Sequence, residues 1–227
     1  MRSSETPVKV WDAPVRLFHW ALVLLVVVMY VTAKLQGDWM TWHMRSGYAI
    51  LALVFFRVLW GFLGSSTARF SSFMAGPGAC LRFGKSLLAR KPAAFASHNP
   101  LGGWMVLVLL LALLVQAGTG LFANDDIATE GPLAALVSKA LSDRLTSVHH
   151  WNFDLLLILT GLHVAAVLYH WGFLKENLIA AMFTGVKRLP AQIASGGAAT
   201  RFASPWRALA LLAVAALAVY LIVKRPF

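Results

Sequence analysis

Residues 148–163 read VHHWNFDLLLILTGLH, an apolar stretch with histidines near both of its ends. His149 and His163 are separated by 14 positions, which in an α-helix is about 21 Å along the axis and only about 40° around it. The two imidazoles would therefore lie on one helix face at two depths. Ionisable side chains are costly inside a membrane and mark functional sites there, so this face is the first candidate site.

Apolar blocks of similar length recur along the chain. Each approaches or reaches the roughly 17–25 residues that a helix needs to cross the hydrocarbon layer, and lipid leaves a spanning segment no alternative to helix for its backbone hydrogen bonds. The chain of 227 residues is 59% hydrophobic and 13% charged, whereas soluble domains contain about 25% charged residues. This composition excludes a soluble enzyme, a disordered chain and a nucleic-acid-binding domain, although the net charge is +11. The five blocks are 15–32, 43–63, 101–122, 149–173 and 206–223.

The segments between the blocks differ in charge. The segment 64–100 carries basic residues and no acidic ones, whereas the loop after the third block carries Asp125, Asp126, Glu130 and Asp143. Because cytoplasmic loops are enriched in Lys and Arg, we expect the N-terminus, 64–100 and the segment after the fourth block to face the cytoplasm, where their cations would meet anionic lipid. Helical spacing of apolar residues also predicts surface helices over 132–145 and, from a weaker pattern, over 73–89.

Two more histidines match the depths of the first pair. His43 lies at the outer end of the second block, level with His149, and His19 lies near the inner end of the first block, level with His163. A haem iron takes its axial ligands from opposite sides of a flat ring, and facing helices can supply them. The four histidines therefore predict two stacked haems with two imidazoles each, an arrangement that favours electron transfer over oxygen binding. The single cysteine, Cys80, excludes covalent attachment through a thioether pair.

Other histidines leave alternatives open. His150 is a second candidate for the outer ligand, and His170 is a poorer candidate for the inner one. All four histidines could instead be hydrogen-bonded packing residues, and the chain would then be a haem-free membrane anchor.

Three arginines at matching depths are candidates for contact with the haems. Arg57 follows His43 by 14 positions and could bind a propionate or a lipid phosphate, or extend to the cytoplasmic interface. Arg16 and Arg45 could also meet propionates, with membrane orientation as the alternative role.

Several glycines lie inside the apolar blocks. A residue without a side chain lets either a porphyrin or a neighbouring helix approach closely. Gly47, which follows His43 by one turn, and Gly161, which closely precedes His163, are the candidates at the haems, while Gly118 and Gly120 lie in the third block.

Four motifs resemble those of a known family. The opening VWDAPVRLFHW, 10–20, looks like the start of bacterial-type cytochrome b561 proteins, a group that includes the b-type cytochrome subunits of membrane-bound hydrogenases. Motifs of the second, third and fourth helices are similar to Trp42-His43 with Gly47-Tyr48, His98-Asn99-Pro100-Leu101-Gly102, and Val148-His149-His150-Trp151 with Gly161-Leu162-His163. The resemblance covers roughly residues 8–188.

The resemblance implies a four-helix core with two b haems, one held by His19 and His163 and the other by His43 and His149. It also implies electron exchange between the quinone pool and a redox partner, which would be a cytochrome c or a dehydrogenase or hydrogenase subunit. Some members of the family oxidise superoxide and reduce quinone, so a superoxide:quinone oxidoreductase is an alternative. A homodimer is left open, as is any enzymatic activity beyond electron transfer.

The predicted fold class is therefore an all-α integral membrane protein of the bacterial inner membrane. It has a four-helix transmembrane bundle that holds two haems, over 8–188, and a linker over 189–204 that contains Gly196 and Gly197. An additional C-terminal transmembrane helix follows over 205–227.

Overall fold

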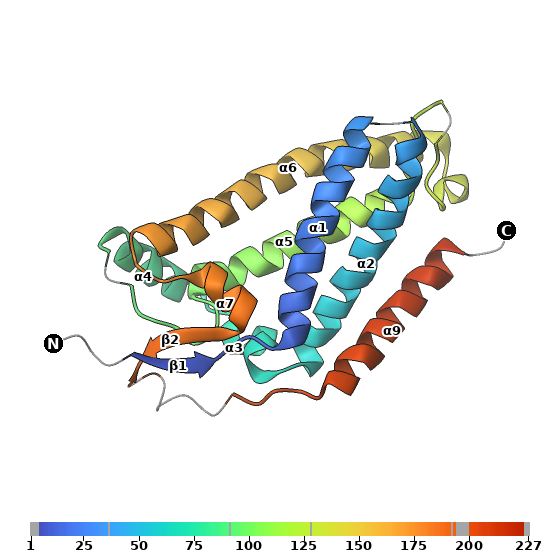
Figure 1. The fold of residues 1–227 in the computed structure, drawn as a ribbon. Helices are drawn as coiled ribbons and strands as arrows, with labels where there is room; N and C mark the ends of the chain where they lie inside the picture. Colours follow the sequence, from blue (N-terminus) through green and yellow to red (C-terminus); the bar gives the residue numbers. More distant parts are fainter. Residues whose placement is uncertain are drawn as a thin grey trace. The chain divides into compact units, whose positions relative to one another are not determined.

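Five long helices contain most of the apolar residues. The computed structural model describes residues 5–35, 37–90, 92–127, 129–191, 193 and 200–224. Within those ranges, five helices are long and apolar enough to cross a membrane, and the predicted fold class is confirmed. These helices are α1 (Ala13–Leu35), α2 (Met40–Leu63), α5 (Pro100–Gly120), α6 (Lys139–Gly172) and α9 (Pro205–Val223) (Figure 1).

The chain divides into two compact units, each made from three separate stretches of sequence. Unit 1 comprises the chain up to Leu17, Leu59–Val108 and Thr160–Ala208, and unit 2 comprises Phe18–Val58, Leu109–Leu159 and the chain from Leu209. The predicted division at 8–188, 189–204 and 205–227 stays a prediction. Gly196 and Gly197 lie outside the described residues.

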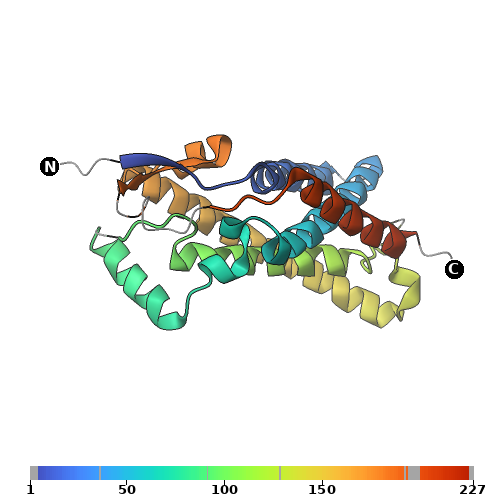
Figure 2. The same cartoon turned by 90° about the horizontal axis from the view of Figure 1, so that it is seen from below.

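A small antiparallel sheet in unit 1 was not predicted from the sequence. Strand β1 (Glu5–Lys9) pairs with β2 (Val186–Pro190), with Glu5 opposite Pro190 and Lys9 opposite Val186 (Figures 1 and 2). Helix α7 (Leu178–Thr184) precedes β2 and is capped by Gly185, whose φ of 81° is the left-handed conformation that glycine adopts without strain. The sheet pairs the segment before α1 with the segment after α7.

Helix α1 begins directly after a buried aspartate of unit 1, Asp12. One carboxylate oxygen of Asp12 accepts a hydrogen bond from the Val15 amide at 2.8 Å, and the other accepts one from the Trp60 indole at 3.0 Å. An aspartate before the first turn satisfies an amide that has no partner within the helix. Asp12 and Trp60 are both buried, so this side chain joins the start of α1 to α2 within the core of unit 1.

The basic segment of unit 1 folds into short helices. A 3-10 turn η2 (Ser66–Ala68) is followed by α3 (Phe70–Phe73) and by α4 (Pro77–Leu88), which begins with proline at a position where no amide donor is needed. The single surface helix predicted over 73–89 is therefore wrong at its start, because no helix is present between Phe73 and Pro77. The predicted helix is found from Pro77 onward.

The start of α6 lies much earlier than the apolar pattern indicates. A 3-10 turn, η3 (Ala134–Leu136), lies just before α6 but is not continuous with it, and a similar turn, η1 (Gly37–Trp39), precedes α2. The single surface helix predicted over 132–145 is thus wrong, since residues from Lys139 belong to the first turns of α6. These turns are held to the preceding loop by Ser142, whose hydroxyl donates to the Phe122 carbonyl at 2.7 Å.

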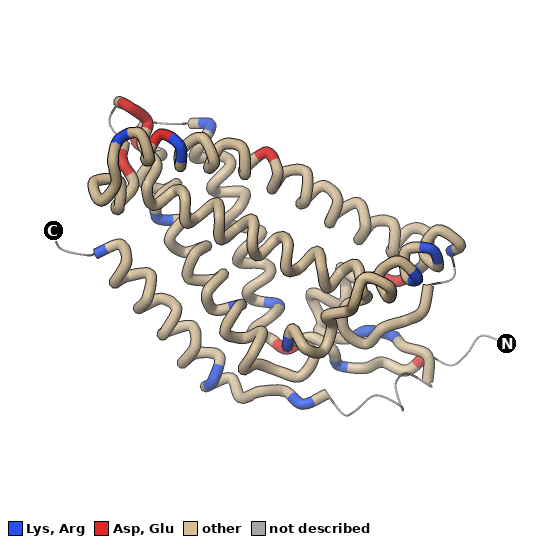
Figure 3. Tube along the Cα trace, turned by 180° about the vertical axis from the view of Figure 1, so that it is seen from behind, with Lys and Arg blue, Asp and Glu red and all other residues tan. Residues whose placement is uncertain are grey.

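The core of unit 2 joins three segments that are distant in sequence. Leu51 of α2, Leu133 of the loop before α6 and Val219 of α9 are buried together with Leu121. Val219 lies in the fifth helix, so part of α9 packs inside unit 2. The loop between α5 and α6 carries acidic residues (Figure 3), one of which, Asp126, pairs with Lys139, as does Asp143 of α6.

Candidate metal centre

Two histidines of unit 2 face each other. His43 of α2 and His149 of α6 have ring centroids 6.4 Å apart, with an interplanar angle of 70°. Metal–imidazole bonds of about 2 Å on both sides of one ion would place two ring centroids roughly 6 Å apart. Both side chains are half-buried. The spacing is therefore that of two imidazoles able to share a single metal ion.

Hydrogen bonds fix which nitrogen of each ring carries the proton. His43 Nδ1 lies 3.1 Å from the Met29 carbonyl oxygen, and His149 Nδ1 lies 2.9 Å from the Gln116 carbonyl oxygen. A carbonyl can only accept, so each Nδ1 is the donor and each neutral ring has its lone pair on Nε2. A second ring nitrogen bound in this way is the usual support for a metal-ligating histidine.

The donor set fits a haem rather than a bare metal ion. Among the described residues, no group of three or more His, Cys, Asp or Glu side chains could hold a metal ion. Two imidazoles are enough protein ligands for a metal ion only where a prosthetic group supplies the remaining ligands, as a porphyrin does with its four nitrogens. His43 and His149 are the residues that would hold such a group, which would supply a one-electron iron couple.

Glycines of the spanning helices differ in how closely they approach this pair. A Cβ placed on Gly120 of α5 would lie 3.0 Å from His149 Cε1, whereas one on Gly118 would meet nothing within 4 Å. A Cβ on Gly47 would make an ordinary contact, 3.6 Å from Met29 Cε, and one on Gly161 would meet nothing. The close approach to a ligand candidate occurs at Gly120, while the roles of Gly47 and Gly161 at the haems stay predictions.

A buried amide one turn beyond His149 joins α6 to α5. Asn152 Nδ2 donates to the Ala112 carbonyl at 2.9 Å and to Gln116 Oε1 at 2.7 Å. Gln116 thus uses its side chain for Asn152 and its backbone carbonyl for His149. Asn152 is a functional candidate that the sequence reasoning missed, although an asparagine one helical turn after a histidine in an apolar helix is a readable signal.

The two histidines of the predicted inner pair belong to different units of the chain. His19 is a half-buried residue of α1 in unit 2, where its ring meets Trp20 edge-on with centroids 5.0 Å apart. His163 is a half-buried residue of α6 in unit 1. Their pairing on one iron stays a prediction.

The remaining histidines have other surroundings. His150 is exposed, and His98 lies against Trp11 and Phe73 with centroids 4.7 and 4.5 Å away. His170 is buried and its Nδ1 lies 2.8 Å from Glu176 Oε2. These environments favour His149 over His150 as the candidate ligand of the outer haem. The His170 ring is instead paired with Glu176.

Glu176 connects His170 to a buried lysine in unit 1. Its second oxygen lies 2.7 Å from Lys187 Nζ, and Lys187 also donates to the Phe95 carbonyl at 2.9 Å. Burial alone would raise the pKa of Glu176, but the hydrogen bond to His170 and the charge of Lys187 outweigh it and lower the pKa to about 2. The carboxylate therefore stays charged and holds α6 near β2.

The three candidate arginines differ in burial and contacts. Arg57 is buried in α2, with 3% of its surface exposed. Arg16 donates to the Phe183 carbonyl at the end of α7. Arg45 is exposed, and its guanidinium lies 5.4 Å from the centroid of the Trp42 ring. Contact of any of the three with a propionate stays a prediction.

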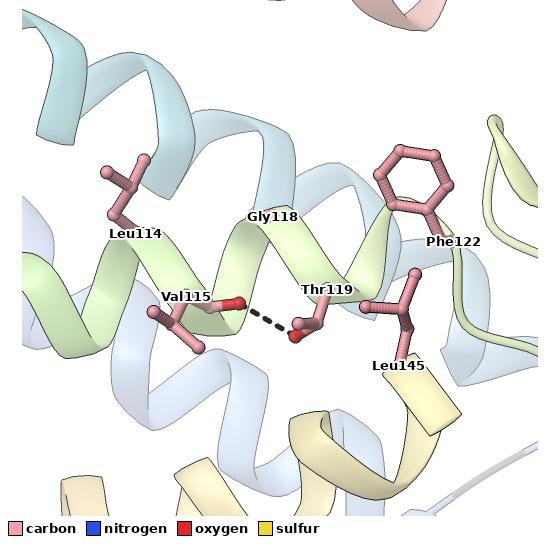
Figure 4. A pocket seen from close by; sticks show the side chains of 6 residues that line it. All are labelled: Leu114, Val115, Gly118, Thr119, Phe122 and Leu145. Atoms are coloured by element: carbon pink, nitrogen blue, oxygen red, sulfur yellow. Dashed lines mark hydrogen bonds between the residues drawn. The ribbon is translucent and has the colours of Figure 1, made fainter. Parts of the chain in front are cut away.

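An apolar pocket of unit 2 is lined in part by Thr119, whose Oγ1 lies 3.3 Å from His149 Nδ1. Its volume is about 340 Å³, and it lies between α5 and the start of α6 (Figure 4). The lining residues are Leu114, Val115, Gly118, Thr119, Phe122 and Leu145. The lining contains no charged residue and no histidine, and Thr119 is its polar member.

Apolar spanning helices and a facing imidazole pair with fixed tautomers define a membrane protein suited to hold haem between helices. A family model of the prokaryotic cytochrome b561 matches residues 10–185, and the chain belongs to this family. It is therefore a multi-pass membrane cytochrome that transfers electrons through b-type haem.

Several known proteins are similar over most of the chain. A probable Ni/Fe-hydrogenase B-type cytochrome subunit of Rhizobium leguminosarum bv. viciae is 24% identical over 214 residues, which cover 78% of this chain and 87% of the relative. The corresponding protein of Rhodobacter capsulatus is 23% identical, covering 80% of this chain and 81% of the relative. A probable superoxide oxidase CybB of Yersinia pestis is 25% identical over 177 residues, covering 72% and 90%. No solved structure matches the chain.

Proposed function

We propose that this chain carries electrons between a membrane quinone and a redox partner protein through two b haems. The observation that carries the proposal is the His43–His149 pair, whose ring centroids lie 6.4 Å apart and whose Nδ1 atoms both donate to backbone carbonyls. Bound haem supplies a one-electron iron couple. The chain's own residues orient the two imidazoles, through the carbonyls of Met29 and Gln116.

The second haem rests on His19 and His163. Both side chains are half-buried, and both lie in long apolar helices, where an imidazole needs a functional reason. We assign them to the inner haem, with Arg57 and Arg16 as candidate propionate partners there and Arg45 as the candidate at the outer haem. Gly47 and Gly161 are the candidate sites of close porphyrin approach.

A hydrogenase is the partner that the relatives favour. Two of the similar proteins are named as hydrogenase B-type cytochrome subunits. A hydrogenase or a related dehydrogenase is therefore proposed as the electron donor, and a cytochrome c is the alternative redox partner. A homodimer of this chain is proposed as a further assembly. The quinone is proposed as the acceptor in the membrane.

Charge distribution supports the proposed orientation. The described residues of unit 1 include Arg69, Arg82, Lys85 and Arg90 in a segment without acids, whereas the α5–α6 loop of unit 2 contains Asp125, Asp126 and Glu130 (Figure 3). By the positive-inside rule, the N-terminus and the basic segment lie on the cytoplasmic side of a bacterial inner membrane.

The decisive experiment is a haem count on purified wild-type, His43→Ala and His149→Ala proteins. We expect about two haems per wild-type chain and the loss of one haem in each variant, with His150→Ala as a matched control that keeps both. Retention of both haems in His43→Ala and His149→Ala would contradict the assignment.

A superoxide:quinone oxidoreductase is the second candidate function. Its support is the similarity to the Yersinia pestis protein named as a probable superoxide oxidase. The acidic α5–α6 loop would repel an anionic substrate, so electrostatic steering does not favour this reaction. Rapid mixing with superoxide decides between the two, because only the oxidase accelerates its disappearance above the buffer rate. A haem-free anchor is disfavoured by membership of a cytochrome family.

A further inference from the structure

Each of the two facing histidines meets the same arrangement of oxygens on a helix adjacent to its own. His43 Nδ1 lies 3.1 Å from the Met29 carbonyl and 3.5 Å from Thr32 Oγ1 on α1. His149 Nδ1 lies 2.9 Å from the Gln116 carbonyl and 3.3 Å from Thr119 Oγ1 on α5. In both cases the threonine follows the carbonyl residue by three positions.

The threonine hydroxyls are oriented by their own helices. Thr32 donates to the Val28 carbonyl at 2.7 Å, and Thr119 donates to the Val115 carbonyl at 2.7 Å (Figure 4). A hydroxyl has one proton and two lone pairs. Because its proton is directed to the carbonyl four residues earlier, each Oγ1 offers a lone pair toward the histidine.

The imidazole Nδ1–H groups therefore each face two acceptors, a carbonyl and a hydroxyl oxygen. Thr32 and Thr119 also lie near carbonyls Met29 and Gln116, at 3.2 and 3.1 Å, so the hydroxyl, the carbonyl and the ring nitrogen form one tight group. The repetition of this group on two different helices, toward two histidines that face each other, argues against a chance contact.

We propose that Thr32 and Thr119 are positioning residues that set the electron-donating strength of His43 and His149 toward the iron of the outer haem. This inference rests on the proposed function. Additional acceptors at Nδ1–H make the imidazole a more basic ligand, and a more basic ligand favours the oxidised iron over the reduced iron. The two threonines thus lower the midpoint potential of the outer haem.

Valine and serine provide matched substitutions at both positions. Valine keeps the branched shape of threonine and removes the acceptor, whereas serine keeps the hydroxyl and removes a methyl group. Loss of one acceptor should change the ratio of reduced to oxidised outer haem about three- to tenfold at a fixed ambient potential, which is about 30 to 60 mV for a one-electron couple. Thr119→Val should have the larger effect, because its oxygen lies closer to the ring.

The test is a spectroscopic redox titration of the purified haem-loaded protein and of four variants, Thr32→Val, Thr32→Ser, Thr119→Val and Thr119→Ser. The outer haem is identified as the one missing from His43→Ala. We expect both valine variants to raise its midpoint, both serine variants to keep the wild-type value, and the inner haem to be unchanged in all four. If one valine variant does not fold, the valine variant at the other threonine and an alanine substitution at the first threonine provide the same test.

Unchanged outer midpoints in the valine variants would overturn the inference, as would equal shifts from serine and valine. These outcomes are distinct from failure of the proposed function, which would appear as retention of both haems in His43→Ala and His149→Ala. Loss of one haem in the histidine variants together with unshifted valine variants would reject the threonine role alone.

Discussion

Gly120→Ala should disturb the outer histidine pair, whereas Gly118→Ala should not. Both glycines lie in α5, two positions apart. A Cβ added at Gly120 would lie 3.0 Å from Cε1 and 3.3 Å from Nδ1 of His149, while a Cβ added at Gly118 would meet no heavy atom within 4 Å. The two substitutions add the same methyl group to the same helix and differ in this contact.

The size of the effect follows from the contact distances. Carbon atoms pack best at about 3.5–4.0 Å, so the His149 ring must shift by several tenths of an ångström. Its hydrogen bond to the Gln116 carbonyl, at 2.9 Å, opposes that shift. Overpacking of this kind costs about 1–3 kcal/mol, which corresponds to roughly 5- to 150-fold weaker haem retention.

The assay is transfer of haem from the purified protein to an excess of a haem-scavenging apoprotein, followed through the Soret band. Gly120→Ala should release the outer haem faster and retain it more weakly. Gly118→Ala should match the wild type or exceed it, since alanine favours helix over glycine by up to about 1 kcal/mol. Equal haem retention by the two variants would refute the reasoning.

Three further predictions concern polar side chains whose hydrogen bonds stabilise the individual units. Asp12→Ala should lower the free energy of unfolding by about 2–4 kcal/mol, because it removes both the cap of α1 and the hydrogen-bond partner of Trp60. In a Trp60→Phe background, the same substitution should cost only about 1 kcal/mol, since the cap alone is then lost. An equal cost in both backgrounds would show that the indole hydrogen bond contributes nothing to stability. Since the pKa of Glu176 is lowered from 4.5 to about 2 on folding, its contribution to stability is present above pH 4.5 and is lost as pH falls toward 2. The difference in thermal stability between wild type and Glu176→Gln should shrink over that interval, and a constant difference would contradict it. Asn152→Leu should destabilise the protein by about 1–3 kcal/mol, because the Ala112 carbonyl and the Gln116 amide lose a buried donor; an unchanged unfolding temperature would argue against this.

The spanning helices were predictable because their signal is local. The second apolar block, 43–63, coincides with α2 apart from its first turn, and the fifth block matches α9 within one residue at its start. Spanning a membrane requires a continuous apolar run, and such a run is visible without knowledge of any partner segment.

The start of α6 and the small sheet could not be read in this way. Residues from Lys139 to Val148 are mixed in polarity, and the hydroxyl of Ser142 joins them to Phe122, a contact that the order of residues does not reveal. Strand β1 pairs with β2 (Val186–Pro190), which lies near the other end of the chain, and periodicity carries no information about such a distant partner.

The candidate site was partly visible in the sequence. Their positions at the outer ends of two apolar blocks predicted that His43 and His149 lie at the same depth, and the structure places their rings together. The carbonyls of Met29 and Gln116 were not predictable, because every residue has a carbonyl and only the packing selects one. Thr32 and Thr119, polar residues of the first and third apolar blocks, were a local signal of that support.

Near-infrared magnetic circular dichroism of the oxidised wild-type protein, quantified per mole of chain, is the most direct test of the central claim, since it reports both the number of low-spin haems and their axial ligands. The account predicts two haems per chain, each with two histidine ligands. A single haem, or a haem with only one histidine ligand, would contradict it.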